Sequence, residues 1–223
     1  MHQTKSKKIL TYFFLFLIIG TLNNKNIHKF NLDTIIKIEV TGLDEQNSIE
    51  LKNNLDFLKT NNLFIMNDTI LKKIIDSNSL IEKYSVFKKY PSILDIKIYK
   101  TKFIAQVKKD DNIFFLGSNG KLIKTINLKK DIPIIYGNFE IHNFFELKKI
   151  MDEINYDYTH IKNFFYFQSG RWDIETNSGI LIKLPNKNLK KSLELSVRII
   201  EDDYQKKINK IDLRQTNQII IND

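Results

Sequence analysis

Two histidines and three neighbouring carboxylates are the residues of this chain whose chemistry first suggests a reactive site. His142 and His160 stand near Asp152, Glu153 and Asp157 in the sequence, so together they could form a metal site or an acid–base cluster. Such sites need ligands at a fixed spacing, as in an HExxH helix, and no comparable spacing occurs here. We therefore interpret these side chains as exposed helix and loop residues and predict no metal site.

Other catalytic signatures are missing from the sequence. The chain has no cysteine, which excludes disulfides, thiolate ligands and a cysteine nucleophile. It also has no glycine-rich phosphate loop and no G-x-S-x-G elbow. Trp172, beside Arg171, could stack on a ligand, but packing in a core or hairpin explains a strand tryptophan more simply. We predict no catalytic residues and no cofactor, and a protein that is not an enzyme.

The net charge of +9 raises the question of nucleic-acid binding. Four of these charges, Lys5, Lys7, Lys8 and Lys25, lie in the first 27 residues, which contain no acid, so the rest carries +5. Arginine, the residue most used for base readout and stacking, occurs three times. The composition therefore disfavours nucleic acid as a partner. With 223 residues, 42% of them hydrophobic, the chain is expected to fold into one or two domains.

The N-terminal segment joins a basic start to a continuous apolar run, ILTYFFLFLIIGTL, from Ile9 to Leu22. The 16 uncharged residues that follow Lys8 would span about 24 Å as a helix, against about 30 Å for a hydrocarbon core. Lysines at both ends can reach the interfaces and supply the missing length. We predict a cytoplasmic tail over residues 1–8, a transmembrane anchor over 9–24 and a linker over 25–34.

A cleaved signal peptide is the alternative for this segment, since such peptides also place a short apolar run after a basic region. Residues 20–24 offer no small-x-small cleavage site, which favours a retained anchor. By the positive-inside rule, the lysines before the run place the N-terminus in the cytoplasm. The bulk of the chain would then lie outside it, and a protein released after cleavage is the competing prediction.

Residues 35–104 show the pattern of a small α+β domain. Ile36, Ile38 and Val40 alternate with Lys37 and Glu39, which predicts a half-buried strand with these three apolar residues on one face. Two helices with apolar stripes follow, the second capped by Asp68, and then two more strands. The predicted elements are a strand over 35–40, helices over 48–59 and 68–78, and strands over 84–89 and 94–99. This β-α-α-β-β order predicts a three-stranded sheet covered by two helices, with edge strands open for pairing.

Residues 105–223 are predicted to form a mixed β-rich domain with two helices. Short strands and turns dominate its pattern, including a hairpin around Asn177-Ser178-Gly179. The predicted elements are strands over 113–116, 122–123, 161–168, 171–176, 179–184, 208–214 and 218–222, and helices over 144–154 and 188–203.

Short motifs follow one another along this order of elements. They are Ile38-Glu39-Val40-Thr41-Gly42, Asn62-Leu63-Phe64, Tyr90-Pro91, Ile104-Ala105, Asn119-Gly120, Ile132-Pro133 with Gly137, Arg171-Trp172 with Gly179 and Leu184-Pro185, and Ile211-Asp212-Leu213-Arg214. In order and spacing they resemble the FtsQ/DivIB family of bacterial cell-division proteins over nearly the whole chain. Departures from that pattern are Lys100, Phe103, Gly117 and the ending Asn222-Asp223.

The resemblance implies a POTRA domain over 35–104 and an FtsQ-type β domain over 105–223, held by a single-pass anchor in the cytoplasmic (inner) membrane. The bulk would lie in the periplasm at the division site. The implied role is a non-enzymatic scaffold that recruits FtsB-like and FtsL-like division proteins, with no small-molecule substrate. The alternative is a POTRA-type chaperone or assembly factor for membrane or secreted proteins. It is disfavoured because such proteins usually carry repeated POTRA units or a membrane barrel.

The C-terminal strand is the predicted partner site, because an apolar edge strand needs either cover or a partner. A partner segment would add to this edge as a further strand, with backbone hydrogen bonds giving affinity and alternate side chains giving specificity. The isoleucines could instead complete the core, and Arg214 could be a structural ion-pair partner of Asp212 or another acid. A further contact region is expected on the second helix and second strand of the POTRA unit. The predicted partner-binding residues are Arg214, Gln215, Thr216, Asn217, Gln218, Ile219, Ile220 and Ile221.

Overall fold

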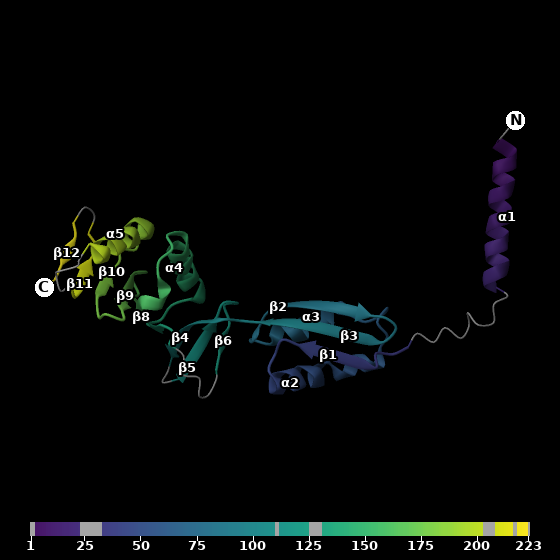
Figure 1. Cartoon of the computed structure of the whole chain (residues 1–223), viewed down its shortest axis with the longest axis horizontal. Helices are drawn as coiled ribbons and strands as arrows, with labels where there is room; N and C mark the ends of the chain where they lie inside the picture. Colours follow the sequence, from purple (N-terminus) through teal and green to yellow (C-terminus); the bar gives the residue numbers. More distant parts are fainter. Residues whose placement is uncertain are drawn as a thin grey trace. The chain divides into compact units, whose positions relative to one another are not determined.

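The computed structural model describes residues 3–22, 33–109, 112–124, 131–202, 208–215 and 218–222 (Figure 1). The chain divides into two compact units. One contains Met1–Leu71 and Val86–Lys97, and the other contains Lys72–Ser85 and Ile98–Asp223. Helices and strands are mixed along the chain, so the predicted α+β class is confirmed.

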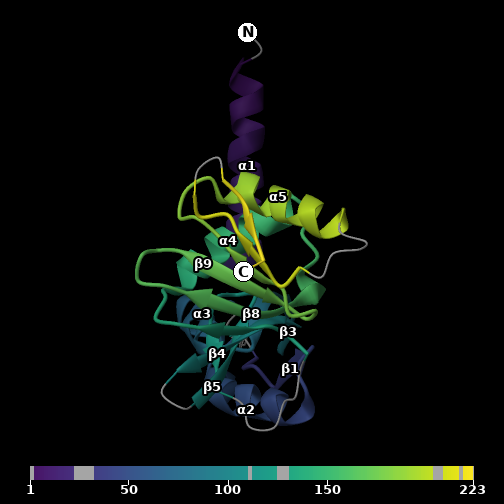
Figure 2. The same cartoon turned by 90° about the vertical axis from the view of Figure 1, so that its left-hand side faces the viewer.

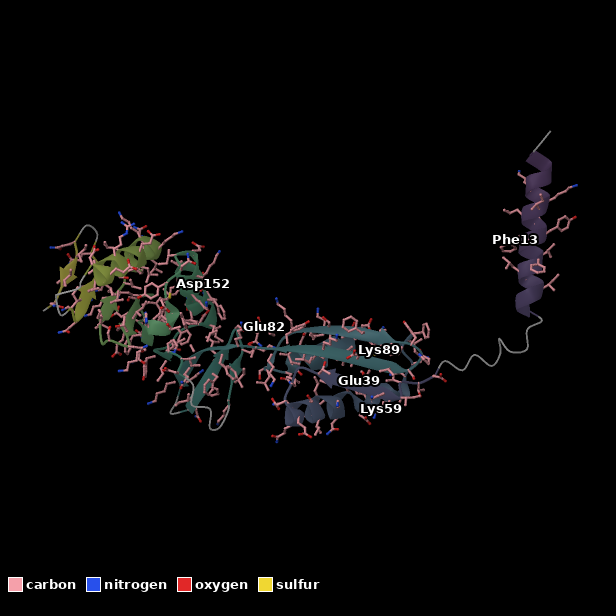
Figure 3. All side chains as sticks on the ribbon, viewed as in Figure 1. Phe13, Glu39, Lys59, Glu82, Lys89 and Asp152 are labelled. Atoms are coloured by element: carbon pink, nitrogen blue, oxygen red, sulfur yellow. The ribbon has the colours of Figure 1, made fainter. Side chains whose placement is uncertain are left out.

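Helix α1 (Gln3–Leu22) contains most of the predicted anchor (Figure 3). Its apolar side chains from Ile9 to Ile19 are exposed, Phe13 among them. Within the described part of the chain, no helix combines the length and the apolar character needed to cross a membrane. The last two residues of the predicted anchor, Asn23 and Asn24, and most of the predicted linker lie outside the described residues.

A three-stranded sheet follows, with the strand order β1-β3-β2. Strand β1 runs parallel to β3, so that Lys37 lies opposite Ile93. The element order is the predicted β-α-α-β-β. The elements are β1 (Lys37–Thr41), α2 (Glu45–Leu55), the 3-10 turn η2 (Asp56–Thr60), α3 (Asp68–Ser77), β2 (Ile81–Lys89) and β3 (Ile93–Lys100).

Two local predictions in this region were wrong. Asp68 is not the cap of α3 but its first residue; the capping side chain is Asn67, whose Oδ1 accepts the backbone N–H of Thr69 at 3.0 Å. Ile36 is not on the buried face of β1, since it precedes the regular strand and is 71% exposed. Ile35 is buried in its place, because the chain enters the sheet through a backbone bond to the following loop, from Ile35 N–H to Asn61 O.

The second unit contains a nine-stranded sheet with the order β12-β11-β10-β9-β8-β7-β4-β5-β6. Its strands are β4 (Phe103–Lys109), β5 (Asn112–Gly117), β6 (Leu122–Ile123), β7 (Ile134–Tyr136), β8 (Ile161–Tyr166), β9 (Trp172–Thr176), β10 (Leu181–Lys183), β11 (Lys210–Asp212) and β12 (Ile220–Ile221). Its helical elements are α4 (Ile141–Glu153), the 3-10 turn η3 (Tyr158–His160) and α5 (Leu189–Glu201). The predicted β9–β10 hairpin is present as an antiparallel pair.

One face of this sheet packs against α4 and α5 (Figure 2). A row of fully buried apolar side chains crosses it in register: Ile135, Phe164, Ile174, Ile182 and Ile211. Trp172 is also buried, with its ring centroid 6.1 Å from that of Phe144. The interpretation of Trp172 as a core residue is therefore confirmed.

A polar cluster joins residues 79–82 to the β4–β6 region within the second unit. The Glu82 Oε2 atom accepts hydrogen bonds from Ser118 Oγ at 2.7 Å and Thr101 Oγ1 at 3.1 Å. The Asn119 amide nitrogen donates to the backbone oxygens of Ser79 and Ile81, each at 2.9 Å. These bonds attach the turn after β5 to the start of β2.

Candidate partner-binding edge

Strand β12 forms one end of the nine-stranded sheet, and within the described residues its paired neighbour is β11. The pair is antiparallel, with Ile221 opposite Ile211 and Ile220 opposite Asp212. Ile219 and Ile221 are 44% and 43% exposed, so they do not complete the hydrophobic core. Among the described strands, none pairs with the other side of β12, where exposed apolar side chains also lie.

Asn222 fixes the position of this short edge strand. Its Oδ1 atom accepts the backbone N–H groups of Asn209 at 2.7 Å and Lys210 at 3.3 Å, and its own N–H donates to Lys210 O at 3.1 Å. Asn222 has φ of 49°, a left-handed conformation that asparagine tolerates better than most residues. The edge is thus anchored at its end by side-chain as well as ladder hydrogen bonds.

Arg214 is an ion-pair partner of Asp212, one of the two roles expected for it. Its Nε atom lies 2.8 and 2.9 Å from the two carboxylate oxygens, and a terminal nitrogen also contacts Oδ2. The hydrogen bonds from Arg214 hold the pKa of Asp212 below its usual range, and the carboxylate in turn raises the pKa of Arg214. Asp212 is buried, whereas the Arg214 side chain is 40% exposed, so part of the guanidinium still faces solvent.

A groove of about 410 Å³ lies between the start of α5 and the segment around Arg214. Its floor and walls include the apolar side chains of Leu195, Leu213 and Ile219. Among the described residues, three basic ones and no acidic one line the groove, and the two cations besides Arg214 are Lys187 and Lys191. The full lining is Pro185, Asn186, Lys187, Asn188, Lys191, Ser192, Leu195, Leu213, Arg214, Gln215, Gln218 and Ile219. The groove can therefore accept an apolar side chain beside an acidic one.

Charged residues continue from the edge across the sheet face opposite the helices. Asp212 lies opposite Lys183, and Lys183 lies opposite Asp173, in one register row. Burial raises the pKa of Asp173, and this effect is opposed by Arg171, whose Nε is 3.3 Å from the carboxylate. The Arg171 guanidinium also lies 4.5 Å from the centroid of the Phe167 ring. This row therefore places Lys183 between two buried carboxylates next to the edge.

The structure brings most of the predicted partner-binding residues together. Arg214, Gln215, Gln218 and Ile219 line the groove, and Ile220 and Ile221 form β12. Thr216 and Asn217 lie outside the described residues. The contribution of Lys187 and of Lys191 on α5 was missed, because these lysines precede β12 by some 30 residues and only the fold places them in the groove beside Ile219.

The histidines considered for chemistry pair with neighbouring carboxylates instead. His142 Nδ1 lies 3.1 Å from Glu140, and His160 Nδ1 lies 3.2 Å from Asp157. All four side chains are more than half exposed. Among the described residues there is no group of three or more His, Cys, Asp or Glu side chains that could hold a metal ion.

Comparison with known proteins finds similarity to cell-division proteins. Residues 105–214 match a family described as cell division protein FtsQ/DivIB, C-terminal. The chain is 23% identical over 203 residues to the cell division protein FtsQ of Rickettsia bellii (strain RML369-C), covering 88% of this chain and 76% of that protein. A solved structure, the major extracytoplasmic domain of the trans isomer of DivIB from Geobacillus stearothermophilus, is 19% identical. It covers 48% of this chain and 98% of that chain, with a TM-score of 0.35.

Proposed function

Since this chain belongs to the FtsQ/DivIB family of bacterial cell-division proteins, we propose that it is a non-enzymatic scaffold of the division machinery that recruits FtsB-like and FtsL-like proteins. The observation that carries this proposal is the open edge of β12 beside the basic, partly apolar groove. An extended partner segment pairs with β12, so that the sheet gains a strand. Its side chains on one face then enter the groove.

The partner segment is expected to combine acidic and apolar side chains. Lys187, Lys191 and the exposed part of Arg214 favour acidic residues at the groove rim. Covering Ile219 and Ile221, each a little over 40% exposed, contributes roughly 1–2.5 kcal/mol in total, given about 1.5–3 kcal/mol for full burial of an isoleucine. Backbone hydrogen bonds to β12 add to the binding free energy, and the ordering of the partner segment opposes binding.

Membrane attachment and domain assignment are further parts of the proposal. Helix α1 is proposed to attach the chain to the cytoplasmic membrane, with the remainder in the periplasm at the division site. Residues 35–104 are proposed to be a POTRA domain and residues 105–223 an FtsQ-type β domain. The supporting features are the apolar character of α1 and the β-α-α-β-β element order.

The test is co-purification of the detergent-solubilised full chain with the FtsB-like and FtsL-like proteins of the same bacterium. A variant that combines Ile219→Asp with Ile221→Asp places charges on the exposed side of the edge, and binding should weaken at least about tenfold, equivalent to about 1.4 kcal/mol. Ile113→Asp is the matched control, because Ile113 is 50% exposed but lies on β5 of the same sheet. Equal binding by the edge variant and the control would exclude β12 as the main partner edge.

A further inference from the structure

Four exposed apolar side chains gather at one end of the three-stranded sheet. Ile36, Phe64, Ile65 and Tyr90 are between 56% and 71% exposed, and we name them the apolar tip. The rings of Phe64 and Tyr90 are in contact, with centroids 4.6 Å apart. The N–H of Ile36 donates to the backbone oxygen of Ser92, which follows Tyr90-Pro91, so this residue lies beside the same turn. Scattered exposed apolar residues are ordinary, but four adjacent ones form a patch that suggests a contact surface.

The loop that carries Phe64 and Ile65 is fixed by hydrogen bonds to Asn62 and by the buried side chain of Leu63. The Asn62 Oδ1 atom accepts the backbone N–H groups of Phe64 and Ile65, each at 3.0 Å. Leu63, between them and Asn62, is fully buried. The two outward side chains are therefore presented by a fixed loop, and they do not need to be ordered when something binds them.

Three described lysines near the apolar tip are paired with carboxylates. Lys37 lies 2.6 Å from Glu39, Lys89 lies 2.8 Å from Asp95, and Figure 3 shows Glu39 and Lys89 in the same region of the sheet. Lys88 and Asp68 form another pair at 3.0 Å. A partner recognised by charge has little to bind here, and a partner recognised by apolar contact is favoured.

The position of the apolar tip along the chain points to the occupant. Thr34 forms a β-bridge with Asn62. The first residues that the structure describes after α1 therefore lie directly beside the apolar tip. In Figure 1 the start of β1 and the turn between β2 and β3 lie at this same end of the sheet. Helix α1 ends at Leu22, and Asp33 lies eleven residues further along the chain. Even fully extended, eleven residues reach at most about 40 Å. The exposed apolar side chains of α1 from Ile9 to Ile19 give this helix a surface suited to contact with lipid.

We propose that the apolar tip docks onto the surface of the lipid bilayer to which α1 is attached, an inference that rests on the membrane attachment in the proposed function. Phe64 and Ile65 enter the boundary between headgroups and acyl chains, and Tyr90 keeps its hydroxyl at headgroup level. Because these three lysines are paired with carboxylates, the contact needs no anionic lipid. This second attachment point limits rotation of the first unit above the membrane.

The absence of cysteine allows a direct test with single spin labels on the full chain. The chain is reconstituted into phosphatidylcholine vesicles, with nitroxides attached at Ile65→Cys, Phe13→Cys or Ile49→Cys. Ile49 is the matched control, because it is 51% exposed and lies on α2 of the same unit. Collisions with oxygen report the bilayer, and collisions with a water-soluble nickel chelate report water.

The expected result is higher oxygen than nickel accessibility at position 65 and the reverse at position 49. Adding anionic phosphatidylglycerol should leave both unchanged. A label at position 65 that behaves like the one at position 49 overturns the proposal. A label shielded from both reagents also overturns it, because it indicates contact with protein. If position 13 still reports the bilayer in either case, the membrane attachment of the proposed function stands and only the docking fails.

Discussion

Replacement of Asn119 by alanine should lower the free energy of unfolding by about 2–3 kcal/mol, because three part-buried hydrogen bonds are lost at about 1 kcal/mol each. Two of them are the bonds from its amide nitrogen to the carbonyls of Ser79 and Ile81, each at 2.9 Å. The third is accepted by Oδ1 from the N–H of Lys121 at 3.0 Å. Alanine has no group that can donate to the two carbonyls or accept from the Lys121 N–H, so the mutation removes all three bonds.

The matched control for this experiment is Asn177→Ala. Asn177 is exposed, and its side chain donates one hydrogen bond, to Thr159 O at 2.9 Å, so its loss should cost under about 1 kcal/mol. Denaturant unfolding of the full chain can be followed by the fluorescence of Trp172, the single tryptophan, which is buried in the core of the same unit. If the two variants differ by less than about 0.5 kcal/mol, a value typical of neutral surface changes, the cluster does not hold residues 79–82 as described.

Two further predictions concern the pH dependence of stability and one backbone position. Arg214 lowers the pKa of Asp212 in the folded chain, so the stability from this pair is present above the unfolded pKa of about 3.9 and is lost as pH falls through the folded pKa. Asp212→Asn should therefore flatten the acid side of a plot of unfolding free energy against pH. An unchanged plot would contradict this role of the pair. Gly137 has φ of 105°, and a Cβ there would overlap the backbone oxygen of Tyr166, so Gly137→Ala should cost more than 2 kcal/mol, roughly the strain range of such positions. Gly170→Ala has open space and a similar positive φ, so thermal unfolding of this control should show the smaller loss, and equal losses would exclude the steric effect.

Local pattern was sufficient to predict the order of most elements. Alternation predicted β1 and β3, and helical spacing predicted α2 and α3, since their buried residues recur with a regular period. The ends of elements depend on capping as well as on periodicity. Helix α4 begins at Ile141 and not at the predicted residue 144, because Glu140 and Asn143 form a capping box ahead of the apolar residues.

Features that depend on distant segments were the ones that local pattern did not predict. The short strand β7 has three residues and gains its place through parallel pairing with β4 and β8. The groove beside β12 also depends on the packing of α5, and so its lysines carried no local signal. For Ile36 the local pattern predicted burial wrongly, because the apolar–polar alternation extends one residue beyond the start of the regular strand at Lys37.

Hydrogen–deuterium exchange of the full chain, alone and with its FtsB-like and FtsL-like partners, tests the central claim most directly. Strand addition gives β12 a second hydrogen-bonded neighbour, so the amides of Gln218 to Ile221 should exchange more slowly in the complex. Strand β6, at the other end of the same sheet, serves as the internal control and should be unchanged. Slower exchange at β6 with no change in the β12 segment would contradict the proposed edge.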